Sequence, residues 1–99
     1  MIDGKWQITI TTPMGPRVAT LDVQTSGGEA YGSLTSDLNE LVQIQDGKYQ
    51  DEELIYSALL NTPMGPADTT TRLRLAGNSL LGTISLSFGT FEVNGERIG

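Results

Sequence analysis

Residues Thr12-Pro13-Met14-Gly15-Pro16 are repeated letter for letter at positions 62–66, fifty residues later (62 − 12 = 50). An identical motif at half the length of a 99-residue chain indicates two copies of one structural unit. Within the motif, Pro13 suits the second position of a type I turn, and Gly15 suits the left-handed conformation that follows it. The motif therefore predicts a short β-hairpin loop in each half of the chain.

The residues on either side of these loops alternate between apolar and polar. Trp6, Ile8 and Ile10 share one face of residues 5–11, which is the period-two pattern of a half-buried strand. No window has the apolar spacing of an amphipathic helix, so we expect no helix. The same pattern predicts eight strands, at residues 5–11, 17–24, 29–35, 41–49, 54–61, 69–75, 80–86 and 90–97.

Three details refine this prediction. Asp46-Gly47 is interpreted as a bulge inside the fourth strand, because residues 50–52 provide the next turn. Gly32 and Gly82 occupy equivalent places at the offset of 50 and indicate bends or a close backbone approach. The predicted inward-facing residues are Trp6, Ile8, Ile10, Leu21, Val23, Leu34, Ile44, Tyr56, Leu60, Leu73, Ile84 and Phe91.

Eight short strands joined by turns predict an all-β fold. A sequential meander loses its exposed edges when it closes on itself, so we expect an eight-stranded antiparallel up-and-down β-barrel. Residues 1–99 would form a single domain with repeat halves at about 4–49 and 54–97. A barrel of eight strands is either filled by side chains or holds one small ligand, and both possibilities remain open at this point.

Composition excludes several classes of function. Six Lys and Arg against twelve Asp and Glu give a net charge of −6, which disfavours nucleic acid and anionic membrane surfaces as partners. The chain has no Cys and no His, which excludes disulfides, thiolate metal sites and the usual Ser-His-Asp and Cys-His arrangements. We expect no metal and no cofactor. No secretory signal and no membrane-spanning apolar run is recognised, and a cytoplasmic location is the default.

In a meander, alternate hairpin turns share one end of the barrel. Four large apolar residues, Met14, Leu38, Met64 and Phe88, fall in the turns at that shared end. They are interpreted either as a soft mouth around an apolar ligand, as a plug over a filled core, or as a dimer surface. Small residues such as Ala19 leave room for a cavity beneath them.

The favoured hypothesis is binding of a small apolar molecule at the end that carries Met14 and Met64. Arg17 follows the first turn and is a candidate for an anionic ligand group, although a solvated side chain is the simpler interpretation. Trp6 is expected at the bottom of the core. The predicted ligand-binding residues are Trp6, Met14, Arg17, Leu34, Leu38, Tyr56, Leu60, Met64, Phe88 and Phe91.

An alternative hypothesis is an isomerase, cyclase or lyase that works without metal. Burial raises the pKa of a carboxyl group, so a carboxylate inside an apolar barrel can transfer protons near neutral pH. Glu92, if a bulge turned it inward, and Tyr56 are the candidate catalytic residues. The simpler interpretations are an exposed strand carboxylate for Glu92 and a core tyrosine with its hydroxyl at the rim for Tyr56.

A third hypothesis is a structural or protein-interaction domain. Four apolar residues point outward on the predicted strands, and they favour a homodimer if they form one patch. They are Tyr31, Ile55, Leu59 and Leu81.

Several short motifs resemble a family of small bacterial β domains of the calycin or lipocalin type. The motifs are Gly4-x-Trp6, the two Thr-Pro-Met-Gly turns, Asp46-Gly47-Lys48, Gly82-Thr83 and the ending Gly89-Thr90-Phe91…Gly95-Glu96-Arg97. The resemblance covers essentially the whole chain and implies a barrel, without implying a catalytic residue set. The chain departs from many members at residues 51–53 and 93–97, and these departures bear on any shared function.

Overall fold

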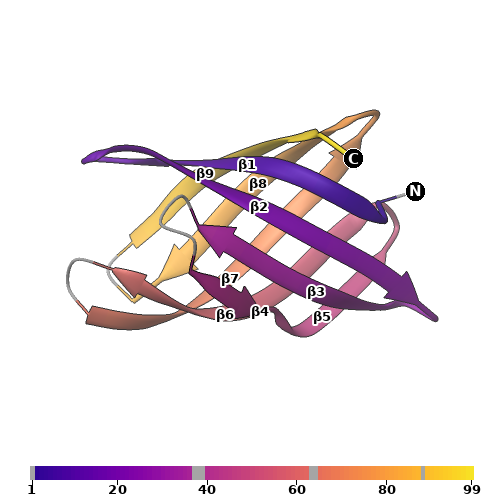
Figure 1. Cartoon of the computed structure of the whole chain (residues 1–99), viewed down its shortest axis with the longest axis horizontal. Helices are drawn as coiled ribbons and strands as arrows, with labels where there is room; N and C mark the ends of the chain where they lie inside the picture. Colours follow the sequence, from indigo (N-terminus) through magenta and orange to yellow (C-terminus); the bar gives the residue numbers. More distant parts are fainter. Residues whose placement is uncertain (1, 37–39, 63–64, 88) are drawn as a thin grey trace.

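The computed structural model describes residues 2–36, 40–62, 65–87 and 89–99, and these residues form an all-β structure (Figure 1). The strands are β1 (Gly4–Thr12), β2 (Gly15–Ser26), β3 (Glu29–Ser36), β4 (Leu41–Gln43), β5 (Gln45–Gln50), β6 (Glu53–Thr62), β7 (Gly65–Ala76), β8 (Ser79–Leu86) and β9 (Gly89–Arg97). Within the described part of the chain, no helix is long and apolar enough to cross a membrane.

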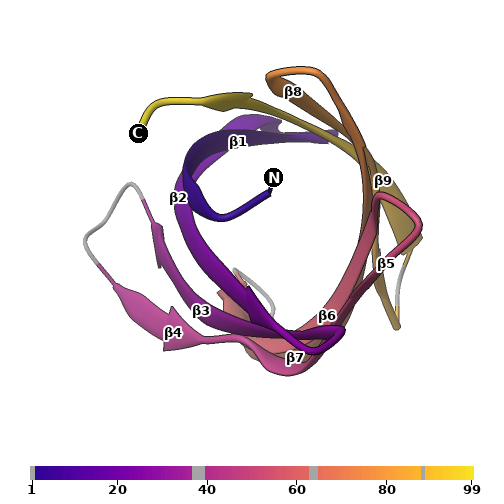
Figure 2. The ribbon, with the colours of Figure 1, turned by 90° about the vertical axis from the view of Figure 1, so that its right-hand side faces the viewer.

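The strands close into a barrel, as Figure 2 shows from one end. Consecutive strands pair antiparallel, except that β4 and β5 both pair with β3 and not with each other; β1 also pairs with β9 from Trp6↔Arg97 to Ile10↔Val93. The fourth expected strand is divided into β4 and β5, which together take one place in the wall. The register of β5 against β6 shifts between Gln45 and Lys48, where the sequence predicted a bulge. The predicted closed, eight-stranded, up-and-down antiparallel barrel is therefore confirmed.

The first Thr-Pro-Met-Gly motif forms a tight hairpin loop, as predicted. Thr12 pairs with Gly15, whose φ of +110° lies in the region that favours glycine. The Thr12 hydroxyl donates to the Gly15 carbonyl at 2.6 Å and accepts from the Met14 N–H at 3.2 Å. In the second motif Thr62 pairs with Gly65, the same register at an offset of 50, whereas Pro63 and Met64 lie outside the described residues.

The two aligned glycines mark the close backbone approach that the sequence predicted. A Cβ on Gly32 would lie 1.8 Å from the Asp22 carbonyl oxygen, and a Cβ on Gly82 would lie 1.8 Å from the Arg72 carbonyl oxygen. Because such distances are far below van der Waals contact, only glycine fits at both positions. The strands can therefore curve tightly around the barrel at these two places.

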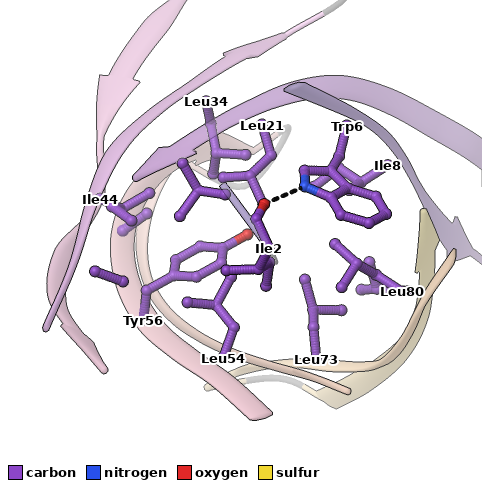
Figure 3. Close-up of a cluster of buried hydrophobic side chains, with 14 of the residues drawn as sticks. Ile2, Trp6, Ile8, Leu21, Leu34, Ile44, Leu54, Tyr56, Leu73 and Leu80 are labelled. Atoms are coloured by element: carbon purple, nitrogen blue, oxygen red, sulfur yellow. Dashed lines mark hydrogen bonds between the residues drawn. The ribbon is translucent and has the colours of Figure 1, made fainter. Parts of the chain in front are cut away.

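One end of the barrel is filled by large side chains, and we call it the filled end. It carries the turns after β2, β5 and β7, and both ends of the chain lie there (Figures 1 and 2). Ile2 is fully buried, and its carbonyl accepts the indole N–H of Trp6 at 2.8 Å (Figure 3). The guanidinium of Arg97 lies 4.4 Å from the Trp6 ring. The side chains that fill this end include Ile2, Trp6, Leu21, Val23, Ala30, Leu54, Leu73 and Leu80.

All twelve predicted inward residues belong to the core or pack against it. The predicted inward set omits six further buried core residues. They are Ile2, Ala30, Leu54, Ala58, Leu80 and Val93.

Candidate functional site: a cavity at the open end

The opposite end of the barrel contains a cavity of about 650 Å³. We call this the open end; it carries the turns after β1, β3, β6 and β8. Every described strand except β5 contributes to the wall, so the cavity lies along the barrel axis. The lining residues are Ile8, Ile10, Thr12, Pro13, Met14, Arg17, Val18, Ala19, Leu34, Ser36, Glu40, Val42, Tyr56, Leu60, Asn61, Thr71, Ile84, Leu86, Phe91 and Val93.

The cavity exists because the inward positions at the open end carry shorter side chains. Ala19 and Ser36 face each other across β2 and β3 at this level. One layer further in, the next residues on those strands, Leu21 and Leu34, pair instead. The interior of an eight-stranded barrel is just wide enough for side chains to fill, so short side chains on several strands leave it hollow.

The structure brings together six of the ten predicted ligand-binding residues on the cavity wall. Leu38, Met64 and Phe88 lie outside the described residues, so their places are not stated. The six are Met14, Arg17, Leu34, Tyr56, Leu60 and Phe91.

Trp6 does not line the cavity. It is fully buried in the filled end, where Ile2 covers its N–H. The prediction of Trp6 as a ligand-binding residue is therefore corrected. Trp6 lies at the bottom of the core, which is the other position that the sequence predicted for it. The reason is that Trp6 lies one layer below Ile8 on the inward face of β1, and Ile8 separates it from the hollow part.

Tyr56 lies at the inner end of the cavity, with its hydroxyl toward the middle of the barrel (Figure 3). Only 1% of its surface is exposed, so its hydroxyl is not at the rim. Burial raises the pKa of Tyr56 to about 12, and hydrogen bonding to the Thr71 side chain opposes this rise. Thr71 is its cross-strand partner on β7 and is also buried.

Glu92 points away from the interior. Its neighbours Phe91 and Val93 line the cavity, whereas Glu92 is exposed on the outer face of β9. The register between β8 and β9 runs unbroken from Ser79↔Glu96 to Leu86↔Gly89, so no bulge turns Glu92 inward in this ladder. The hypothesis that Glu92 supplies a carboxylate inside the barrel is therefore wrong.

The mouth of the cavity carries both apolar and polar side chains, and Met14, which is 85% exposed, lines it as predicted. Arg17 has the same inward parity on β2 as Ala19 and lies at the exposed edge of the wall. On the other side of the mouth, the Asn61 amide donates to the Glu40 carboxylate at 2.7 Å. Within residues 2–36, 40–62, 65–87 and 89–99, no three acidic side chains gather as a metal site requires.

The sequence reading missed several lining residues for an identifiable reason. Ile8, Ile10 and Ile84 were assigned to the core but not to a site, because alternation shows which face a residue takes and not whether the space before it is filled. Thr71 could have been predicted from the repeat. It aligns with Leu21 at the offset of 50, and a threonine in the position of a core leucine indicates a polar group on the inner wall.

The outward-facing apolar residues are dispersed. Tyr31, Leu59 and Leu81 are more than half exposed, as expected, whereas Ile55 is only partly exposed. The three exposed residues lie on β3, β6 and β8, and no two of these strands are adjacent in the sheet. The structure thus offers no single patch among them, and a homodimer stays a prediction.

No protein-family model and no curated protein matches the chain. Solved structures with a similar fold include a redesigned β-barrel, b11L5F_LGL, with a TM-score of 0.71 and 13% identity over 99% of this chain and 92% of the other. Another is the redesigned β-barrel mFAP1, solved bound to DFHBI, with a TM-score of 0.68 and 12% identity over 98% of this chain and 94% of the other. At these identities the likeness shows the fold alone. Membership of the bacterial calycin-like family stays a prediction, and the chain is shown to be a closed, all-β, antiparallel barrel.

Proposed function

We propose that this protein binds a small, largely apolar molecule in the cavity at the open end. The observation that carries the proposal is the cavity itself, whose volume of about 650 Å³ falls within the range of small-molecule sites. Its wall is mostly aliphatic, with a few hydroxyls and with both polar and apolar side chains at the mouth. An apolar cavity with a few well-placed polar groups is typical of such sites.

The division of the barrel into two ends also supports binding. Unfilled apolar space lowers stability, because the side chains around it lose packing partners. At the filled end, Trp6, Leu54 and Leu73 are fully buried, and none of them lines the cavity. A ligand in the open end would restore the missing contacts there, and the packed filled end would hold the wall in place.

The chemistry of the wall favours binding over catalysis. A general acid or base works best with a pKa near the operating pH, and the pKa of Tyr56 is raised to about 12. Tyr56 can donate a hydrogen bond but is poorly suited to proton transfer at neutral pH. With Glu92 on the outer face, the carboxylate version of the enzyme hypothesis loses its candidate.

The comparison with solved barrels is consistent with this proposal. mFAP1 was solved bound to DFHBI, and its fold resembles that of the present chain. The likeness supports binding as a role that a barrel of this size can perform. It does not transfer the identity of the ligand, which must come from the residues of this wall.

The proposal is tested by filling the cavity. N-phenyl-1-naphthylamine, a neutral fluorophore whose emission rises in apolar surroundings, would be titrated into the wild type, Ala19→Phe and Ala76→Phe. Ala19 lines the cavity, whereas Ala76 is exposed at the filled end and serves as the matched control. We expect saturable binding to the wild type and to Ala76→Phe, and loss of binding in Ala19→Phe. Equal binding by all three proteins, or no saturable binding to the wild type, would contradict the proposal.

A further inference from the structure

The inner end of the cavity carries two hydroxyl groups in otherwise aliphatic surroundings. Among the described lining residues, those that are buried comprise four aliphatic side chains and two hydroxyl-bearing ones. The hydroxyls belong to Tyr56 and Thr71, which are 1% and 2% exposed and pair directly across β6 and β7. The aliphatic residues are Ile8, Leu34, Ile84 and Val93.

The equivalent pair in the other half of the barrel carries no hydroxyl. Trp6 pairs with Leu21 across β1 and β2. At an offset of 50 along the chain, Tyr56 pairs with Thr71 across β6 and β7. Leu21 has no polar atom, and the Trp6 N–H is used internally by the Ile2 carbonyl. The Tyr56 hydroxyl is hydrogen-bonded to the Thr71 side chain, so the pair can be buried at little cost and keeps a polar point on an otherwise aliphatic inner wall.

The charges of the wall lie elsewhere. The described charged residues that line the cavity are Arg17 and Glu40, and both are exposed at the mouth. None of the six buried lining residues carries a charge. An ionised group at the inner end would lose its hydration without gaining an opposite charge, which is strongly unfavourable.

Building on the proposed function, we propose that the ligand is an uncharged molecule with an apolar body and a carbonyl-type oxygen at its inner end, and that Tyr56 donates a hydrogen bond to this oxygen. Thr71 orients the phenol, and its own hydroxyl adds to the polar character of the wall at this place. The inner end then selects for the oxygen, while the aliphatic wall selects for the apolar body. This ligand class includes aromatic ketones and excludes ligands that would place a carboxylate at the inner end of the cavity.

The protonation of Tyr56 agrees with a donor role. Since burial raises its pKa to about 12, the phenol keeps its proton throughout the neutral and mildly alkaline range. A neutral phenol in apolar surroundings is a good donor to a carbonyl, because no water competes for the hydrogen bond. The selectivity we infer should therefore be the same at every pH in that range.

Two probes of nearly the same shape test this proposal. In 2-acetylnaphthalene a carbonyl oxygen takes the place of one methyl group of 2-isopropylnaphthalene. Calorimetric titration of both probes would be carried out on the wild type, Tyr56→Phe and the control Tyr49→Phe, whose tyrosine is only partly buried and does not line the cavity. We expect Tyr56→Phe to weaken binding of the ketone about tenfold, the scale of one hydrogen bond. Binding of the hydrocarbon should change less than about twofold.

The outcomes separate this inference from the proposed function. If both probes bind the wild type but Tyr56→Phe weakens both equally or neither, the ligand class is wrong and the proposed function stands. If neither probe binds the wild type, the proposed function fails and this inference fails with it. A second measurement does not depend on the variant folding. The C=O stretching band of carbonyl-¹³C-labelled 2-acetylnaphthalene should lie at a lower frequency when the ketone is bound to the wild type than when it is dissolved in cyclohexane, and a band at the cyclohexane frequency would overturn the inference.

Discussion

The two ends of this barrel are built from the same strands but are packed differently. At the filled end, Ile2 and Trp6 are fully buried, and the indole N–H donates to the Ile2 carbonyl. At the open end, short side chains such as Ala19 and Ser36 leave a cavity of about 650 Å³. The difference indicates that one end mainly stabilises the fold, whereas the other end keeps the space that binding requires.

The two hairpins that share the Thr-Pro-Met-Gly turn show how small the sequence changes are. Their registers are identical at an offset of 50, from Trp6↔Leu21 and Tyr56↔Thr71 to the glycines that end each turn. The first hairpin presents only apolar groups at this level, apart from an indole N–H that is already bonded. The second presents two hydroxyls to the cavity. Nearly equal backbones therefore carry unequal inner surfaces.

The largest contrast in stability is expected for truncation of an aromatic residue at each end. Trp6→Ala removes a fully buried side chain from the filled end and should cost about 4 kcal/mol of unfolding free energy. Phe91→Ala removes a half-buried side chain that already borders the cavity and should cost about 1–2 kcal/mol. Urea unfolding followed by circular dichroism measures both. Equal losses would mean that the ends are packed alike.

The next contrast concerns two glycines with positive φ. Gly32→Ala places a Cβ 1.8 Å from the Asp22 carbonyl oxygen, so we expect a loss of about 3 kcal/mol. Gly15→Ala, in the turn at the open end, meets nothing within 4 Å and should cost only the backbone strain of about 1 kcal/mol. The same unfolding assay compares them. A loss at Gly15 as large as that at Gly32 would refute the close approach as the cause.

A third pair of variants should change stability in opposite directions. Ala30→Leu overfills the filled end, where Ala30 is 4% exposed, and should destabilise the protein by about 2 kcal/mol. Ala19→Leu adds apolar atoms to the cavity wall and should stabilise it by up to about 1 kcal/mol. Thermal unfolding reports both signs in one experiment. Destabilisation by both substitutions to the same degree would indicate that the open end has no free space.

The smallest effect is the pH dependence of the carboxylate that holds the N-terminal segment over the filled end. Asp3 accepts from the Thr25 N–H at 3.0 Å and from the Thr25 hydroxyl at 2.7 Å, and these hydrogen bonds lower its pKa below the ordinary value of 3.8. Because the folded-state pKa is depressed, the stabilisation is present above pH 3.8 and is lost as the pH falls through the folded-state pKa.

Asp3→Asn tests this linkage. The wild type should exceed the variant in stability at neutral pH, and the difference should shrink as the pH falls below 3.8 and through the lowered folded-state pKa. Chemical unfolding of both proteins across this range measures it. A difference that does not change with pH would exclude the Asp3 carboxylate as the titrating group.

The architecture was predictable because its determinants are local. Alternation of Trp6, Ile8 and Ile10 defines a strand face, and the Pro-Met-Gly turn chemistry defines the hairpin and its register. The bulge near Gly47 and the close approach at Gly32 also followed from residue type alone. These signals together specify a meander, and closure follows from the need to cover the edges of the sheet.

The division into a filled and an open end was not predictable in the same way. It depends on the summed volumes of side chains from all the strands, which meet only after the barrel has closed. Ile2 precedes the first strand and has no periodic pattern, so its role in filling one end left no signal in the sequence. Trp6 was placed on the correct face but assigned to the ligand site, because alternation does not give depth along the axis. Glu92 was misassigned because a bulge was allowed where the ladder is regular.

The central claim is that the open end is hollow and apolar, and a crystal structure determined under xenon pressure tests it most directly. Xenon binds in apolar cavities of proteins. We expect xenon density between Leu34, Leu60 and Ile84, with none beside Trp6 and Leu73 at the filled end. Side chains closed over the axis at both ends, with no xenon between them, would contradict the account.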